Sequence, residues 1–340
     1  MLFRSKNIFR TAGLMLIFAC MAAAGEDVVY VTTLATSYTH VGQNQTLSGL
    51  FFQTPGDTTW GFMARPNNRV YSMDAYPPSG GRILAMATHT GVQQSWDSGK
   101  TWKTTSDWRM TEVSLVRFAA DDPRKIYAAS PYGFYKTTDD GRTWTLHNNG
   151  LDHPDATFVT ALVIDDSRPG RLLISTEAGL YESDDDGEHW NAGTLEVNHV
   201  RTLVQHPRNP EVWFAGTEDH GLYRSVNHGK NWQKCDTGIL HNTLYSIAFD
   251  PSHPDTLYAG GFQTGVYKSS DGGKTWKQFF SGLTSLDVHS LAVDPVDGRR
   301  VYAGSTGHGV FLSQDGGLTW RHHGITGGYV WSIKIVNFER

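Results

Sequence analysis

Short apolar runs alternate with turn-forming residues along most of the chain. One stretch reads LYSIAFDP (244–251), the next reads TLYAGG (256–261), and the third reads GVYKSSDGGKTW (265–276). Each run is rich in β-branched and aromatic residues, and Gly, Asp, Asn or Pro separates it from the next. Runs of this length and composition predict short antiparallel strands rather than helices.

The third stretch predicts a β-hairpin whose turn is held by its own side chains. Gly-Val-Tyr-Lys forms one strand, Asp-Gly-Gly makes the turn, and Thr-Trp begins the return strand. Ser269 and Asp271 carry oxygens that can accept backbone N–H groups in the turn, and Gly273 can adopt a positive φ. We expect the Trp276 ring to cover the turn, with its indole N–H donating to a local acceptor.

The hairpin occurs six times, and its closing Trp recurs at steps of 42, 46, 42, 44 and 44 residues. A decayed seventh copy ends at Trp60, 42 residues before the first of these. A catalytic residue would be needed once, so we interpret the repeated residues as structural staples of the turn. They are Asp97 and Trp102, Asp139 and Trp144, Asp185 and Trp190, Asn227 and Trp232, Asp271 and Trp276, and Asp315 and Trp320.

Each unit of about 44 residues holds four strands, which is typical of one β-propeller blade. The last strand, VWSIKIVNF, lacks a second strand after it, and DVVYVTTL near the start lacks a first strand before it. Residues 27–63 and 330–340 are therefore predicted to form one composite blade. The predicted fold is all-β: one domain (25–340), a seven-bladed β-propeller of four-stranded antiparallel blades, closed by N-terminal strands that pair with the C-terminal strand.

Residues 1–24 have the pattern of a secretory signal peptide. Arg4, Lys6 and Arg10 precede the apolar run AGLMLIFACMAAA, which ends in small residues. The run is short for a membrane span. We therefore expect an exported protein, periplasmic or secreted, with no transmembrane span after cleavage of the leader. A lipoprotein leader acylated at Cys20 and an uncleaved anchor are the alternatives.

Composition narrows the possible partners. The formal net charge is -5, and loss of the three cations of the leader would take it to about -8. An acidic exported protein is a poor candidate for nucleic acid or for anionic membrane surfaces. Cys235 is the one cysteine after the leader, so no internal disulfide can form. We expect a monomer without a cofactor. The stretch 35–48 is interpreted as a long surface loop, with a functional loop as the alternative.

Candidate binding residues follow from the order of the strands. The start of each first strand and the connections between second and third strands share one face of a propeller, around the central channel. Five first strands begin with Val/Leu-x-Ser/Thr, and the variable residue x is aromatic, Arg or His. Such side chains suit a pocket that stacks a ring and hydrogen-bonds polar groups, although they could also only pack on neighbouring blades. The candidate ligand-binding residues at the channel mouth are Tyr71, Ser114, Thr160, Arg201, Tyr245, His289 and Trp331.

Other polar residues near this mouth predict neither a metal site nor a catalytic pair. The histidines of the surrounding loops lack a two-His spacing on one element with a carboxylate partner, so no metal is expected. Glu112, Asp155 and Asp287 lie near the starts of first strands without forming an evident pair for glycoside hydrolysis. No catalytic residue is therefore assigned.

The repeated hairpin resembles the Asp-box, or BNR repeat, with the pattern S-x-D-x-G-x-T-W filled by residues 269–276. On these motifs the chain resembles the Asp-box propeller superfamily over residues 27–340. That superfamily includes sialidases, xyloglucan-degrading two-propeller glycosidases, the luminal domain of sortilin and the photosystem II assembly-factor propellers. The resemblance implies the propeller fold, and it is closest to the non-enzymatic photosystem II assembly-factor-like and sortilin-like group.

That group implies an exported binding or assembly scaffold whose channel mouth binds a peptide, a protein partner or a glycan. The alternative is a carbohydrate-active enzyme of the sialidase or glycoside hydrolase type. Sialidases use a triad of arginines. In this sequence only one arginine, Arg201, lies at the start of a first strand, so the triad is not visible. The two-propeller glycosidases need a second propeller to form their cleft, whereas this sequence predicts only one propeller.

Overall fold

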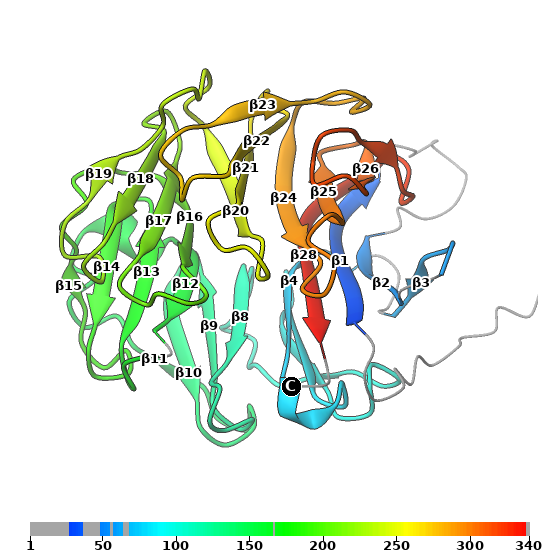
Figure 1. Ribbon diagram of the computed structural model, residues 1–340. Helices are drawn as coiled ribbons and strands as arrows, with labels where there is room; N and C mark the ends of the chain where they lie inside the picture. The colour runs from blue at the N-terminus through cyan, green and yellow to red at the C-terminus, as the bar shows by residue number, and fades with distance from the viewer. Residues whose placement is uncertain (1–26, 37–47, 55–56, 64–67, 166, 338–340) are drawn as a thin grey trace, which may run out of the picture.

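A computed structural model describes residues 27–36, 48–54, 57–63, 68–165 and 167–337. The predicted leader (1–24) and most of the predicted loop 35–48 lie outside the described residues. In the described part, seven four-stranded antiparallel sheets are arranged as blades around a central axis (Figure 1). The predicted all-β, seven-bladed propeller is confirmed.

The strands fall into four sets, counted outward from the axis. The innermost are β4 (Val70–Ala75), β8 (Leu115–Phe118), β12 (Val159–Ile164), β16 (Val200–Gln205), β20 (Leu244–Phe249), β24 (Val288–Val293) and β28 (Gly328–Asn337). The second are β5 (Leu84–Thr88), β9 (Ile126–Ser130), β13 (Leu172–Thr176), β17 (Trp213–Thr217), β21 (Leu257–Gly261), β25 (Val301–Ser305) and β1 (Asp27–Thr36).

The third are β6 (Gly91–Ser95), β10 (Gly133–Thr137), β14 (Gly179–Ser183), β18 (Leu222–Ser225), β22 (Val266–Ser269), β26 (Gly309–Ser313) and β2 (Gly49–Gln53). The outermost are β7 (Lys103–Thr104), β11 (Thr145–Leu146), β15 (Asn191–Ala192), β19 (Gln233–Lys234), β23 (Lys277–Phe279), β27 (Arg321–His322) and β3 (Gly61–Phe62). Two short 3₁₀ helices, η1 (Pro77–Ser79) and η2 (Pro154–Thr157), complete the elements. Within the described ranges, no helix has the length and apolar character needed to cross a membrane.

The composite blade closes the ring as the sequence predicts. Its strand order is β28-β1-β2-β3, so the C-terminal strand is innermost and the N-terminal strand is second (Figure 1). The two long strands pair antiparallel, with Val29 opposite Ile335 and Val31 opposite Ile333. Strands from the two ends of the chain therefore share one sheet, which leaves no unpaired strand edge at the seam.

The core is divided among the interfaces between blades. In the described part of the chain, seven clusters of buried apolar side chains each combine residues of two neighbouring blades. Tyr302 of β25, for example, packs with Val31 of β1 and Ile333 of β28. Tyr302 and Val31 are fully buried. A side chain of this size stabilises the fold by roughly 1.5–3 kcal/mol when it leaves water.

The turn between third and fourth strands is held by the predicted side chains. Ser269 Oγ accepts the backbone N–H of Gly273 at 3.0 Å, and Asp271 accepts that of Thr275 at 3.0 Å and its hydroxyl at 2.6 Å. Gly273 has φ 80, the left-handed conformation that glycine adopts without cost. These hydrogen bonds lower the pKa of Asp271, which stays ionised at neutral pH. The fourth strand begins two residues later than predicted, at Lys277 rather than at Thr275.

The sequence predicted that each closing tryptophan donates its indole N–H to an acceptor in its own turn. Four of these tryptophans donate this hydrogen bond among the described residues, and in three of them the prediction was wrong. The indole N–H of Trp276 donates to the backbone oxygen of Cys235 at 2.9 Å, just past β19 of the preceding blade. Trp190 and Trp60 likewise donate to His147 and His323 of preceding blades, and Trp102 donates both to local Gly99 and to Met63. The tryptophan therefore links two blades as well as covering a turn.

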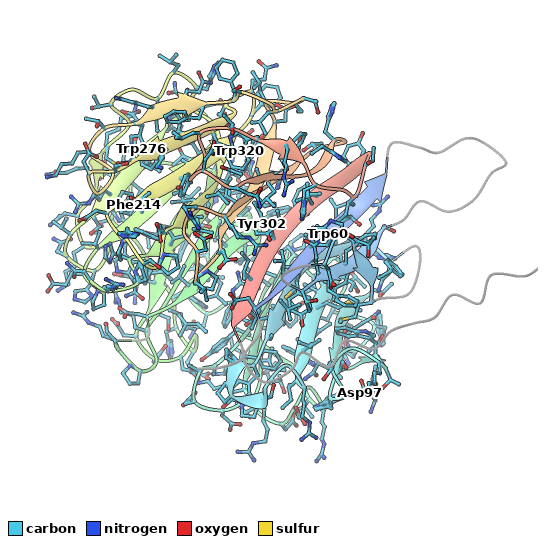
Figure 2. The ribbon with its side chains drawn as sticks, turned by 45° about the vertical axis from the view of Figure 1, so that its right-hand side comes forward. Trp60, Asp97, Phe214, Trp276, Tyr302 and Trp320 are labelled. Atoms are coloured by element: carbon cyan, nitrogen blue, oxygen red, sulfur yellow. The ribbon has the colours of Figure 1, made fainter. Side chains whose placement is uncertain are left out.

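A glycine in the preceding blade makes room for this link. Gly238 has φ 93, and a Cβ there would lie 2.2 Å from the backbone oxygen of Trp276. The backbone N–H of Trp276 donates to Thr237 at 2.9 Å in the same place. Gly150 and Gly282 approach Trp190 and Trp320 in the same way, so the segment after the outer strand receives the next blade at these three places (Figure 2 shows Trp276 and Trp320 in successive blades).

Replacing Trp276 by Phe tests the energy of one such link. We expect Trp276→Phe to lower the free energy of unfolding by about 1 kcal/mol more than Trp320→Phe, because only the first removes a hydrogen bond. Trp320 is buried to the same degree, and its indole N–H has no partner among the described residues. Urea unfolding of both variants measures the difference, and equal losses would show that the bond adds nothing.

Candidate functional site

A β-bulge at the start of the first strands creates the predicted mouth. In six blades the pairing of first and second strands shifts by one residue at the position called x above, as between Val70 and Ser72. The extra residue has no partner in the ladder, so its side chain is free to turn toward the channel. The residues in this position are Tyr71, Thr160, Arg201, Tyr245, His289 and Trp331.

Four of these residues form a continuous row of rings, here called the aromatic arc. The ring of His289 stacks on Tyr245, with centroids 5.0 Å apart, and lies 4.0 Å from the ring of Trp331. Trp331 in turn meets Tyr71 edge to face at 6.2 Å. The arc spans four consecutive blades, and Trp331 remains 39% exposed. The sequence therefore located residues that the fold does bring together.

The arc is uncharged near neutral pH. Burial between the two neighbouring rings lowers the pKa of His289 to about 4, so its imidazole is neutral and packs as an aromatic ring. Burial raises the pKa of the Tyr71 phenol, and its hydrogen bond to Glu112 at 2.7 Å raises it further. The arc thus offers apolar ring surface with hydroxyl groups at its ends.

Arg201, the next residue around the ring, is committed to two carboxylates. Its Nη1 donates to Glu177 at 2.5 Å and its Nε to Glu218 at 2.7 Å. His199 also contacts Glu177. Burial opposes ionisation of Glu177, but its bonds to His199 and Arg201 prevail and lower its pKa. Neither glutamate was predicted from the sequence, although both lie in the connections between second and third strands that line this face.

The last two predicted residues, Ser114 and Thr160, connect neighbouring blades rather than line an open mouth. The hydroxyl of Ser114 donates to the backbone oxygen of Val159 at 3.2 Å, and that of Thr160 donates to Val200 at 2.7 Å. Both acceptors belong to the first strand of the next blade. These short side chains therefore join neighbouring inner strands, and the mouth is aromatic on one side and polar on the other.

Exposed apolar side chains gather on the same face. This mouth face consists of the loops from fourth to first strands, the turns from second to third strands and the starts of the first strands. Thirteen large apolar residues are exposed in the described part of the chain, and nine of them lie on the mouth face. They are Trp108, Tyr132, Phe158, Leu240, Phe262, Phe280, Leu286, Tyr329 and Trp331. Such a concentration is typical of a surface that contacts another molecule.

Metal and thiol chemistry find no support among the described residues. No group of three or more His, Cys, Asp or Glu in the described ranges could hold a metal ion. Burial raises the pKa of the Cys235 thiol to about 12, which leaves it protonated and unreactive at neutral pH. The described side chains of this face offer ring surfaces, hydroxyls and paired charges.

The fold and this mouth define a class of protein, the seven-bladed β-propeller with an apolar, aromatic-lined face. No family model matches the sequence, and no curated protein matches it at a significant level. Solved structures do match in fold. The GH74 xyloglucanase of Xanthomonas campestris is 16% identical with a TM-score of 0.70, covering 87% of this chain and 52% of its own.

Two other kinds of protein also match in fold. YCF48 bound to D1 peptide is 18% identical with a TM-score of 0.57, covering 86% of this chain and 84% of its own. The extracellular domain of BT4673 from B. thetaiotaomicron is 17% identical with a TM-score of 0.62, covering 85% of this chain and 40% of its own. The chain spans between 38% and 55% of the length of the GH74 enzymes it matches. At these identities the likeness concerns the fold alone.

The neutral His289 predicts a pH dependence of stability. Its pKa is about 4 in the folded protein against an ordinary 6.5, so the unfolded chain takes up the proton first. The stabilisation is complete above pH 6.5 and is lost as the pH falls toward 4. We expect the wild type to lose more stability than His289→Phe between pH 7 and pH 4, as measured by urea unfolding. An exposed-site control, His241→Phe, should follow the wild type, and parallel curves for His289→Phe would contradict the assignment.

Proposed function

We propose that this protein is an exported binding propeller that holds a peptide or a segment of a partner protein on its mouth face. The aromatic arc carries the proposal. Four rings in contact form a preorganised apolar platform at the channel mouth, and eight further exposed apolar residues surround it. Rigid aromatic anchors within a wider apolar surface are typical of the energetic centre of protein interfaces.

Two further observations support a peptide or protein over a glycan. Tyr245 and Trp331 cover the two faces of the His289 ring. The arc therefore presents mainly ring edges, and only parts of the Trp331 and Tyr71 rings stay open. A sugar would need an open ring face on which to stack. YCF48 has been solved with D1 peptide bound, so a propeller of this general fold can hold a peptide. The predicted leader (1–24) is the basis for proposing export.

A carbohydrate-active enzyme is the second candidate, and the glutamate pair at the mouth favours it. Glu177 and Glu218 share the guanidinium of Arg201, so two carboxylates lie close together as glycoside hydrolysis requires. Such an enzyme also needs one acid with a raised pKa, whereas the pKa of Glu177 is lowered. The guanidinium would have to leave before either carboxylate could act, so the binding function is preferred.

A peptide array and a glycan array probed with the purified protein test the proposal. We expect peptide ligands with apolar side chains, and Trp331→Ala should weaken their binding at least tenfold, since a central aromatic anchor contributes about 2 kcal/mol or more. Val296→Ala is the matched control, because Val296 is 69% exposed on the opposite face. Thermal unfolding of each variant verifies that the fold is kept.

The outcomes separate the candidates. Peptide binding that survives Trp331→Ala would remove the arc from the function. Binding confined to glycans, with hydrolysis that Glu177→Gln abolishes, would establish the enzyme instead.

A further inference from the structure

A large cavity lies at the end of the channel opposite the aromatic arc. It has a volume of about 720 Å³, within the roughly 300–1,000 Å³ of ordinary ligand pockets. Its walls come from the ends of the first strands and the loops that follow them, whereas the arc occupies the beginnings of those strands. The cavity therefore forms a second site, separate from the proposed mouth.

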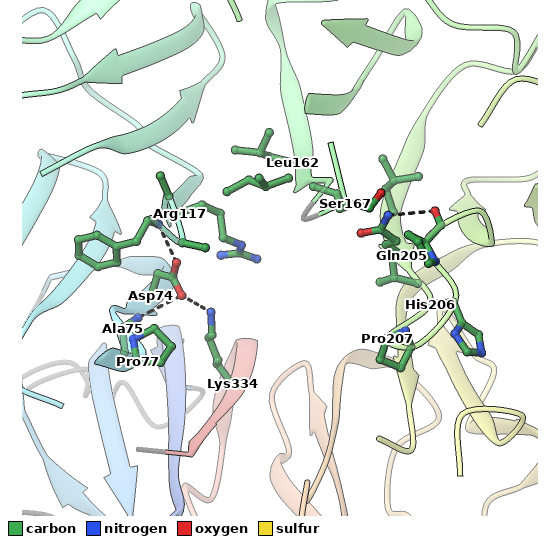
Figure 3. A pocket seen from close by; sticks show the side chains of 18 of the residues that line it. Asp74, Ala75, Pro77, Arg117, Leu162, Ser167, Gln205, His206, Pro207 and Lys334 are labelled. Atoms are coloured by element: carbon green, nitrogen blue, oxygen red, sulfur yellow. Dashed lines mark hydrogen bonds and ion pairs between the residues drawn. The ribbon is translucent and has the colours of Figure 1, made fainter. Parts of the chain in front are cut away.

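One wall of the cavity is charged and comes from three consecutive blades (Figure 3). Asp74 of β4 and Lys334 of β28 form an ion pair, and the carboxylate of Asp74 also accepts the backbone N–H of Phe118 at 2.8 Å. Asp74 is 4% exposed. The charge of Asp74 is therefore neutralised by partners within the protein.

Arg117 of β8 points its guanidinium into the cavity from the same wall (Figure 3). One of its nitrogens donates to the backbone oxygen of Val116 at 2.9 Å, and it forms no ion pair with any described residue. A guanidinium has five N–H donors, so most of its bonding capacity is unused. Arg208 also lines the cavity, but it donates to two backbone oxygens, of Pro251 and Ser252.

The charge balance of the lining is positive in an otherwise acidic protein. Arg117, Lys334 and Arg208 contribute three cations, and Asp74 contributes one carboxylate. An apolar part of the lining comes from Leu162 and Val163 of β12 and from Leu203 and Val204 of β16, beside the polar Ser167, Gln205 and His206. An anion with an apolar body would meet both surfaces at once.

The geometry points to a site for a carboxylate that carries an apolar or aromatic group. The carboxylate would accept two parallel N–H bonds from Arg117, and its apolar part would lie on the β12 and β16 wall. A singly charged carboxylate matches the charge of Arg117, because Lys334 is already paired with Asp74. A small organic acid and the C-terminal residue of a peptide both carry a carboxylate beside an apolar group, so either could occupy the site.

N-acetyl-phenylalanine and its amide test this inference, because they differ in the charged group alone. We expect the acid to bind the full-length protein at least tenfold more tightly than the amide in isothermal titration calorimetry, since hydrogen bonds to a charged group are the stronger ones. Arg117→Met should remove that preference and leave binding of the amide unchanged. Arg117→Lys, which keeps the charge without the fork, should retain part of it.

Controls separate this site from general charge and from the mouth. Arg124→Met removes a cation outside the cavity that is already paired with Asp122, and it should bind the acid like the wild type. Trp331→Ala should also leave this binding unchanged, so failure of the proposed function is distinguishable from failure of this inference. A five-residue peptide ending in Phe, with a free or amidated C-terminus, identifies the source. Tighter binding of the free peptide than of the acid indicates a chain end, and tighter binding of the acid indicates a small molecule.

Three results would overturn the inference. The first is equal binding of acid and amide, and the second is acid binding that Arg117→Met does not weaken. The third is no binding of either probe up to its solubility limit, with the unfolding curve of the protein unchanged.

Discussion

Burial between blades is the constraint on which this structure depends. A four-stranded blade has two faces, and each face is covered only by a neighbouring blade. The apolar clusters accordingly lie at the interfaces, and each needs both of its blades. An open row of blades would expose an apolar face at each end. Pairing of β1 with β28 removes both ends, so the strands from the two ends of the chain stabilise every other blade indirectly.

The same closure brings seven inner strands together around the axis, and the bulges determine what they display there. A bulged residue leaves the hydrogen-bonded ladder, so its identity can vary while the flanking Val or Leu stays in the core. Val288 and Ser290 are buried on either side of His289, for example. Three bulges carry aromatic rings and one carries His289, which is packed as a ring because burial keeps it neutral. Ser114 and Thr160 instead bridge inner strands, which explains why short hydroxyl side chains suit those blades.

Much of this could be predicted from the sequence because the repeat carries it. The spacing of the closing tryptophans gave the blades, the unmatched end strands gave the composite blade, and the Val/Leu-x-Ser/Thr pattern located the arc. Contacts between blades could not be predicted in the same way. The indole of Trp276 bonds to Cys235 some forty residues earlier, and a repeat examined one copy at a time suggests a local partner. Glu177 was missed for the same reason, since it meets Arg201 from the neighbouring blade, whereas Glu218 meets Arg201 within one blade but from a different strand connection.

The charged wall of the cavity shows how position in the ring creates a site that no single repeat contains. Asp74, Arg117 and Lys334 each stand three residues after a mouth residue, and two of the corresponding positions, Val163 and Val204, form the apolar wall. One turn of the ring therefore presents two layers of side chains, one at each end of the channel. Because Lys334 belongs to the last strand and Asp74 to β4, their ion pair exists only in the closed ring. Closure thus neutralises Asp74 and leaves Arg117 as the cation with free bonding capacity, so the seam that completes the core also sets the charge of the cavity.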